Sequence, residues 1–292
     1  MAQHIFKQVW TAISHLNPND VRALADQGVL IGLYARSEES YEEMEEYFIP
    51  SHLSRERRLE AFNHLFRSTE KNAPPRFDIE IFEEGLPRPQ SAFLYRRHHP
   101  QRMIEEILAA RESFVLPLAR LFPPFYQPAM DRIIHTVAKE NALFSLATAL
   151  PDVIPSVVSL PWAVGEFASD TAVLTVNQVR MAFLLAAASD RTIGYGEQRG
   201  EIGSILAGAF GWRAVARELV GKIPFGGGLI PKAAIAYAGT YVAGRVLERM
   251  YREGYSMSRQ ERKDAYEGAF DTGKRVAKQL LEAVSPRKAE AK

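Results

Sequence analysis

The chain of 292 residues has no cysteine and almost no net charge, with 36 Lys and Arg against 35 Asp and Glu. The missing thiols exclude disulfides, thiolate nucleophiles and thiolate metal sites, and they are compatible with a reducing compartment. The balanced charge provides no overall field that would attract nucleic acid. We therefore expect a cytoplasmic protein that does not bind nucleic acid.

Long apolar runs are missing as well. Between residues 142 and 244 the chain is rich in apolar residues, but charged residues interrupt it before any run reaches the roughly 20 residues of a membrane-spanning helix. Val153 to Gly165, the longest charge-free stretch there, also contains Pro155 and Pro161. We expect these segments to form packed helices of a soluble core. Reversible membrane contact, or a hairpin that inserts conditionally, is the alternative.

The usual catalytic motifs are also lacking. No H-E-x-x-H, G-x-S-x-G or G-x-G-x-x-G pattern occurs. The adjacent pair His98-His99 cannot point to one face of a strand, so it does not predict a metal site. We expect no catalytic residue, no metal and no cofactor, and we predict that the protein is not an enzyme.

The first part of the chain combines a helix with a small α/β unit. Apolar residues recur at helical spacing from Ile5 to Leu16, which predicts an amphipathic helix that packs on its own protein or, alternatively, anchors at a membrane surface. Short runs rich in strand formers then alternate with helical patterns. We expect strands at 28–35, 76–82 and 92–95, and helices from Glu38, at 54–68 and over 100–121 with a kink at Pro117.

The second part is expected to be all helical. Phe122-Pro123-Pro124-Phe125 is the clearest boundary in the chain, and proline and glycine break the apolar helices that follow. The predicted class is α+β, mostly α, with two or three strands followed by a helical bundle. The expected domains are 1–122, 123–254 and 255–292, and the expected helices of the second part are 129–150, 170–189, 201–220, 231–252 and 258–284.

Four polar residues interrupt one of these apolar helices. Asp170, Asn177, Gln178 and Arg180 lie where unsatisfied polar groups would be costly, so they need partners. Asp170 and Asn177 are seven apart and share a helix face. We expect a buried hydrogen-bond network that includes Arg180, and we favour a structural role for it over a functional site.

Small residues predict close helix crossings in the same region. Gly203, Ala207 and Gly211 are spaced four apart, and so are Ala236, Thr240 and Gly244, which gives two helices a ridge of small side chains. Such ridges occur both in soluble bundles, which we favour, and in membranes. The string Pro224, Gly226, Gly227 and Gly228 predicts a tight connector before a helix with Pro231 in its first turn; the alternative is an anion site at that turn.

Ordered short motifs between Arg132 and Glu253 resemble a bacterial family. They are Pro151-Asp152, Ala168-Ser169-Asp170, Asn177 to Met181, Tyr195-Gly196, Ile223 to Gly228, Ala238-Gly239-Thr240 and Gly244. Together they resemble the YcjF-like domain of unknown function, which is often fused to GTPases or encoded beside them. The resemblance implies an all-α, GTPase-associated and often membrane-linked accessory domain without established catalytic residues.

This resemblance makes the first α/β unit worth comparing with a GTPase. A P-loop places G-x-x-x-x-G-K-[ST] after a strand, but here Ser37 and Glu38 stand where the second glycine and the lysine should be, and a glutamate would repel a phosphate. We therefore expect a degenerate P-loop that no longer binds nucleotide. Gly268 to Lys274 matches the glycine and lysine spacing, but Arg275 follows and no strand precedes it, so we interpret it as a chance match.

These observations predict a non-enzymatic bacterial adaptor or regulator. The expected partner is a protein, with a GTPase implied by the resemblance, and the expected location is the cytoplasm or the inner face of the membrane. A peripheral membrane protein with conditionally inserting helices is the first alternative, and a residual NTP-binding enzyme is the second.

Overall fold

The computed structural model describes residues 9–148, 170–208 and 228–284. The chain divides into two compact units. The α/β unit contains Asn19–Arg132 and Ala186–Ile193. The helical unit contains Met1–Pro18, Ile133–Leu185 and Gly194–Lys292. The expected α+β class with mostly helical structure is confirmed.

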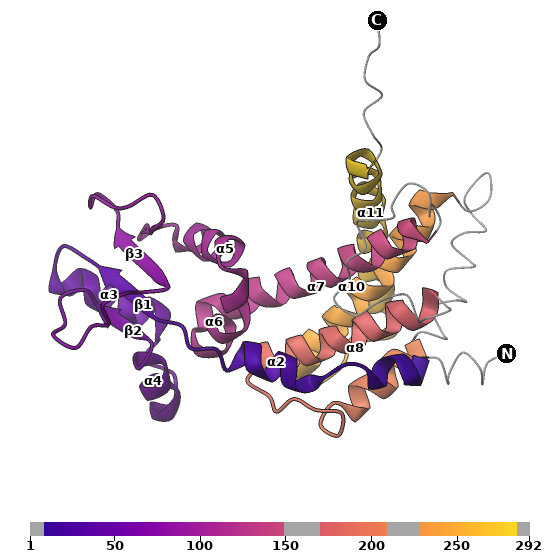
Figure 1. The fold of residues 1–292 in the computed structure, drawn as a ribbon, viewed down its shortest axis with the longest axis horizontal. Coiled ribbons are helices and arrows are strands. Elements are labelled where there is room, and N and C mark those ends of the chain that lie inside the picture. The colour runs from indigo at the N-terminus through magenta and orange to yellow at the C-terminus, as the bar shows by residue number, and fades with distance from the viewer. Residues whose placement is uncertain (1–8, 149–169, 209–227, 285–292) are drawn as a thin grey trace, which may run out of the picture. The chain divides into compact units, whose positions relative to one another are not determined.

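The α/β unit is built around a parallel sheet with the strand order β2-β1-β3-β4 (Figure 1). The switch in direction falls between β1 and β3, because β2 lies on one side of β1 and β3 on the other. The elements are α2 (Pro18–Ala25), β1 (Ile31–Tyr34), α3 (Glu38–Phe48), α4 (Arg55–Phe62), β2 (Leu65–Arg67), β3 (Ile79–Glu83), β4 (Phe93–Tyr95), α5 (Pro100–Ala110), the 3-10 turn η1 (Glu112–Phe114) and α6 (Val115–Leu121).

Strand register separates the two faces of this sheet. Ile31 pairs with Ile79 and Leu33 with Ile81, and all four side chains are fully buried on one face. On the other face, the ring of Phe77 lies directly over Gly32, where an added Cβ would come within 2.4 Å of it. No residue larger than glycine fits at this position without moving that ring.

The sheet has four strands rather than the two or three that we expected. The helix predicted over 54–68 ends at Phe62, and Leu65–Arg67 forms β2 instead. Leu59, Phe62 and Leu65 are spaced as in a helix, so the prediction extended the helix through residue 68. A three-residue strand is too short to show its own alternation of apolar and polar residues. The expected kink at Pro117 is also absent: the helix is interrupted at Arg111, and Pro117 lies in the first turn of α6.

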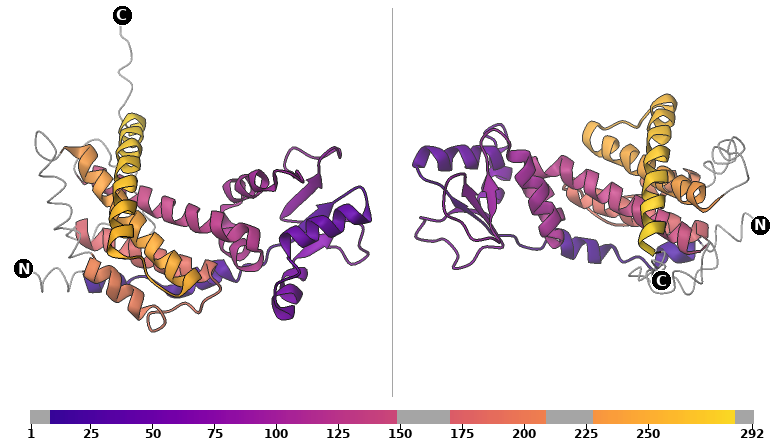
Figure 2. Two further views of the ribbon diagram at one scale, coloured as in Figure 1. Left: turned by 180° about the vertical axis from the view of Figure 1, so that it is seen from behind. Right: turned by 90° about the horizontal axis from the view of Figure 1, so that it is seen from above.

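The helical unit contains residues 9–14, part of α7 (Pro123–Ala147), most of α8 (Asp170–Ala188), a helix at residues 199–208, α10 (Leu229–Glu253) and α11 (Arg259–Val284). Its core is formed largely by small side chains, which lets the helices approach closely. Figure 2 shows α11 packed across α10. One buried cluster joins α7, α10 and α11 through Ala138, Ala142, Leu146, Ala233, Tyr237, Val276 and Ala277.

The first helix belongs to the helical unit and not to the α/β unit. Val9, Ala12 and Ile13 are buried, and the hydroxyl of Tyr195 donates to the carbonyl of Ile13 at 2.6 Å. The C-terminal helix α11 belongs to the same unit. The first segment of the α/β unit ends inside α7, at Arg132. The domain bounds expected from the sequence, 1–122, 123–254 and 255–292, stay a prediction.

One helix within the described residues is long and apolar enough to cross a membrane. Thr171–Ala188 in α8 has a mean hydropathy of 1.4, although Arg180 lies within it. We had expected no such segment. This finding is weak evidence for a membrane span, because 72% of the segment is buried within the protein and the core helix of a soluble protein passes the same test.

Candidate functional site

A buried polar network connects α7, α8 and α10 within the helical unit. Asn141 on α7 and Asn177 on α8 are fully buried, and Thr240 on α10 is almost fully buried. The amide of Asn177 donates to Oδ1 of Asn141 at 2.9 Å, and the amide of Asn141 donates to Oγ1 of Thr240 at 2.7 Å. One chain of hydrogen bonds therefore joins all three helices.

Charged groups complete the network at one end. Nε of Arg180 donates to Oδ1 of Asn177 at 3.1 Å, and the same guanidinium forms an ion pair with Glu140. The amide of Asn177 also donates to this carboxylate at 3.1 Å. The amide of Gln178 on α8 also donates to Oγ1 of Thr240, at 3.2 Å.

The sequence had pointed to half of this network. The structure brings Asn177, Gln178 and Arg180 together as members of one network, whereas the side chain of Asp170 lies outside the described residues. Asn141 and Thr240 were not predicted as partners. Thr240 is a lone small polar residue within an apolar helical stretch, whereas Asn141 directly follows Lys139 and Glu140. A single sequence does not show which helices face each other.

The chemistry of these groups favours a structural role. Amides and hydroxyls do not ionise near neutral pH, and an arginine stays protonated. Satisfied hydrogen bonds of this kind contribute about 1 kcal/mol each, whereas a buried group left without a partner costs about 1–3 kcal/mol. The network therefore selects one register of the three helices over others.

The two predicted ridges of small residues have different surroundings. At Gly244 an added Cβ would lie 2.7 Å from Cγ1 of Ile134 and 3.1 Å from the sulfur of Met181, so α10 crosses α7 and α8 closely there. Gly203 and Ala207 are exposed, and a Cβ at Gly203 would meet no described atom within 4 Å. Gly211 lies outside the described residues.

The remaining glycine motifs have structural surroundings where they are described. Pro224, Gly226 and Gly227 lie outside the described residues, and Gly228 is the N-cap of α10. The P-loop-like string from Gly268 lies inside α11. Gly273 within it allows a second close crossing, because a Cβ there would lie 2.9 Å from Cα of Ala234 on α10.

A second candidate site lies in the α/β unit, at the carboxyl ends of β1 and β3. In open parallel sheets ligands bind at this point, where the strand order reverses direction. Here the carboxylate of Glu83, the last residue of β3, accepts a hydrogen bond from the backbone N–H of Arg36 at 2.8 Å. It also accepts from the guanidinium of Arg36 at 3.3 Å and from the hydroxyl of Ser40 at 3.2 Å.

The Glu83 carboxylate has the surroundings of a bound anion. Burial raises the pKa of this carboxyl, but the donors of Arg36 and Ser40 outweigh burial and hold the pKa below its ordinary value. Ser37 caps α3, accepting from the backbone N–H of Ser40 at 3.2 Å. Glu38, at the place of a P-loop lysine, pairs with Arg67 at the end of β2. The donors that would hold a phosphate therefore already hold a carboxylate of this chain.

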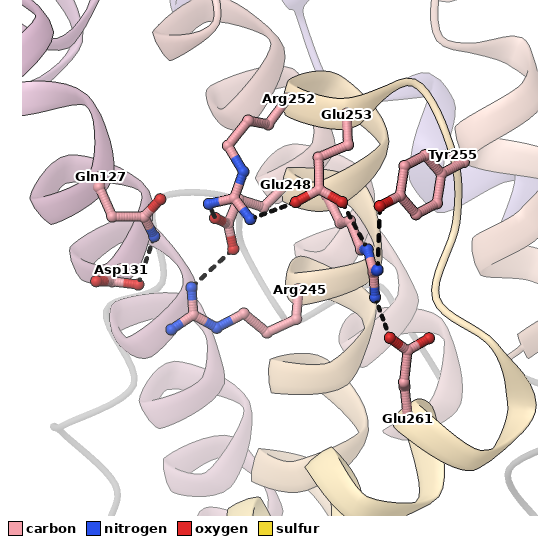
Figure 3. Close-up of polar contacts among 9 residues, drawn as sticks. Gln127, Asp131, Arg245, Glu248, Arg252, Glu253, Tyr255 and Glu261 are labelled. Carbon is pink, nitrogen blue, oxygen red and sulfur yellow. Dashed lines mark hydrogen bonds and ion pairs between the residues drawn. The ribbon is translucent and has the colours of Figure 1, made fainter.

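A cluster of ion pairs fixes the corner between α10 and α11. Arg245 and Arg252 flank the buried carboxylate of Glu248 at 2.7 and 3.2 Å (Figure 3). Glu253 and Glu261 pair with Arg249, which also contacts Tyr255. Hydrogen bonds from Arg252, Tyr255 and Arg249 lower the pKa of Glu253 to about 2, and those from Arg249 and Ser258 lower the pKa of Glu261 to about 2. The cluster joins the two helices on either side of Gly254, whose φ of +81° forms the turn.

No metal site among the described residues and no similarity to a known protein assigns a function to the chain. Within the described residues no group of three or more His, Asp or Glu side chains is placed to hold a metal ion. The chain matches no protein-family model, no curated protein and no solved structure.

Proposed function

We propose that this chain is a non-catalytic accessory protein that acts in the cytoplasm by binding another protein, and that its partner is a GTPase. The partner class comes from the resemblance of Arg132 to Glu253 to the YcjF-like family. The α/β unit would then retain the parallel sheet of a nucleotide-binding protein but no longer bind a nucleotide. Any GTPase activity belongs to the partner.

The observation that carries this proposal is the hydrogen bonding of Glu83. A nucleotide phosphate at the β1–α3 loop would need the N–H of Arg36 and the hydroxyl of Ser40, and both are used by the Glu83 carboxylate. A phosphate would also be repelled by that carboxylate at short range. We therefore expect the donors of Arg36 and Ser40 to stay bound to Glu83 rather than to bind a nucleotide phosphate.

Helix α4 supports the proposal of a protein partner. Of its eight residues, Ala61 alone is buried. Leu59 is 58% exposed and Phe62 is 37% exposed, and they are three residues apart, so they are neighbours on one helix face. Large apolar side chains beside each other on a charged helix are a feature of protein-binding surfaces.

Affinity capture tests the proposed function. Tagged full-length protein is incubated with bacterial lysate containing either GDP or GTPγS, and the retained proteins are identified by mass spectrometry. We expect a P-loop GTPase to be retained, and Leu59→Glu to reduce its amount. Leu24→Glu is the matched control, because Leu24 is 45% exposed on α2 of the same unit. Retention of no GTPase above a tag-only control, in either nucleotide, contradicts the proposal.

Peripheral membrane contact is the second candidate function. It is favoured by Trp10, which is 54% exposed on the helical segment at residues 9–14 and is a residue type that prefers the membrane interface. Liposome flotation with and without anionic lipid tests it. We expect Trp10→Ser to reduce flotation severalfold if this helix is the anchor, and equal flotation of both proteins argues against that role.

A further inference from the structure

A charged pocket in the α/β unit is not used by the proposed function. Its lining includes three arginines and two aspartates, and its volume is about 280 Å³. This volume is close to the lower end of the range for small-molecule sites. The charged residues are Arg22, Asp26, Arg120, Asp190 and Arg191, and we name this site the arginine pocket.

The arginine pocket carries an excess of one positive charge, because its three arginines face two aspartates. Two charged partners lie just beyond the lining and have opposite signs. Arg57 pairs with Asp190 at 3.3 Å, and Glu60 lies 3.7 Å from Arg120. These two neighbours carry opposite charges, so together they do not alter the count within the lining.

The hydrogen bonds of Arg22 go to neutral groups. Its Nε donates to the carbonyl of Ile193 at 2.9 Å, its Nη2 donates to the same carbonyl, and its Nη1 donates to Oδ1 of Asn19 at 3.0 Å. All these acceptors are neutral, and no carboxylate among the described residues pairs with this guanidinium. Three of its five N–H donors are used, so two remain for a ligand.

Arg120 lines the same pocket. Its Nη1 lies 3.1 Å from Asp26, but its buried Nε has no hydrogen-bond partner among the described residues. Buried donors without acceptors are rare in folded proteins, so such a group calls for an acceptor. An oxyanion is the ligand that satisfies an uncompensated guanidinium such as that of Arg22.

We propose that the arginine pocket binds a phosphate group. Arginine guanidinium groups match phosphate oxygens in charge and geometry, and a tetrahedral anion presents its oxygens in several directions, as a pocket lined by three arginines requires. The group belongs either to a free phosphate or to a phospholipid headgroup. This inference does not rest on the proposed function, because its residues are neither those around Glu83 nor those on α4.

Thermal unfolding in sodium phosphate, at ionic strength matched with sodium chloride, tests the free ligand. Flotation with phosphatidylcholine vesicles, with and without phosphatidic acid, tests the lipid. We expect one of the two to bind the full-length protein, and Arg22→Gln to weaken that binding about tenfold or more. Asp190→Asn should strengthen it, because asparagine tolerates the φ of 54° at this position and removes one opposing charge.

The controls distinguish phosphate binding in the pocket from a general salt effect. Arg102→Gln removes a 71% exposed arginine of α5 in the same unit and should leave binding unchanged. Arg191→Gln is a second pocket variant, for use if Arg22→Gln unfolds the protein. Binding of phosphate or of phosphatidic acid that both pocket variants weaken supports the proposal. Binding of neither ligand, or equal binding by wild type and pocket variants, overturns it.

Discussion

Asn141 connects all three helices of the buried network. It accepts from Asn177 and donates to Thr240, both across helix boundaries. We predict that Asn141→Ala lowers the free energy of unfolding by about 2–3 kcal/mol, because two buried groups lose partners. Urea unfolding followed by circular dichroism measures the change.

Thr136→Ala is the matched control for this prediction. Thr136 is exposed on the same helix, and its substitution should change the free energy of unfolding by less than about 0.5 kcal/mol. Equal effects of the two substitutions would show that the hydrogen bonds of Asn141 add nothing to the free energy of unfolding.

Two glycines of α10 provide an internal comparison at the residue scale. Gly244→Ala should destabilise the protein by about 1–3 kcal/mol, because the added methyl group would collide with Ile134 and Met181. Gly239→Ala should instead stabilise it by up to about 1 kcal/mol, since a Cβ there meets nothing within 4 Å among the described residues and alanine favours the helix. Paired urea titrations would contradict the account if both substitutions shifted stability in the same direction.

At the scale of elements, the corner between α10 and α11 should depend on pH. The pKa of Glu253 and that of Glu261 are lowered from 4.5 to about 2, so their ion pairs contribute fully above pH 4.5 and are lost as the pH falls towards 2. We expect carboxyl ¹³C NMR titrations to give these low values. Arg249→Gln should raise the pKa of Glu261 towards 4.5 and that of Glu253 by less, because Arg252 still pairs with Glu253, whereas Arg102→Gln should change neither. Ordinary values in the wild type would contradict the contacts of Arg249.

The loop between β1 and α3 should depend on Glu83. Glu83→Gln removes the negative charge that accepts from Arg36 and Ser40. We expect faster amide hydrogen exchange at Arg36, whose backbone N–H donates to Glu83, because a hydrogen bond to a neutral amide is weaker. Glu80→Gln on the same strand is the control and should leave exchange at the Arg36 amide unchanged. Unchanged exchange in Glu83→Gln would mean that the carboxylate does not hold the loop.

Local elements followed from the sequence better than the pairings between them. The bounds of α8 were predicted within one residue, since its apolar run is long and begins at Asp170. The strand β2 was missed, because three residues carry too little periodicity and Leu65 also fitted a helix. The partners of Asn177 and the hydrogen bonds of Glu83 join residues far apart in the chain, so only the fold reveals them.

At the scale of the whole molecule, the polar groups of the two units differ in what they hold. The helical unit is held in one register by a buried polar network and by close crossings at Gly244 and Gly273. The α/β unit retains a parallel sheet, but a carboxylate of its own uses the donors at the point where such sheets bind ligands. The proposed role as a partner of a GTPase follows from this second property together with the family resemblance.

The central claim is that the sheet edge around Glu83 binds no nucleotide. The most direct measurement is a backbone amide NMR titration of the full-length protein with millimolar Mg²⁺ and GTPγS, following Arg36, Ser37, Ser40 and Gly85. These amides report on the sheet edge and not on the arginine pocket. The account predicts that none of the four signals shifts in a saturable manner. Saturable shifts of the Arg36 and Ser40 amides would contradict it and would favour a residual nucleotide-binding function.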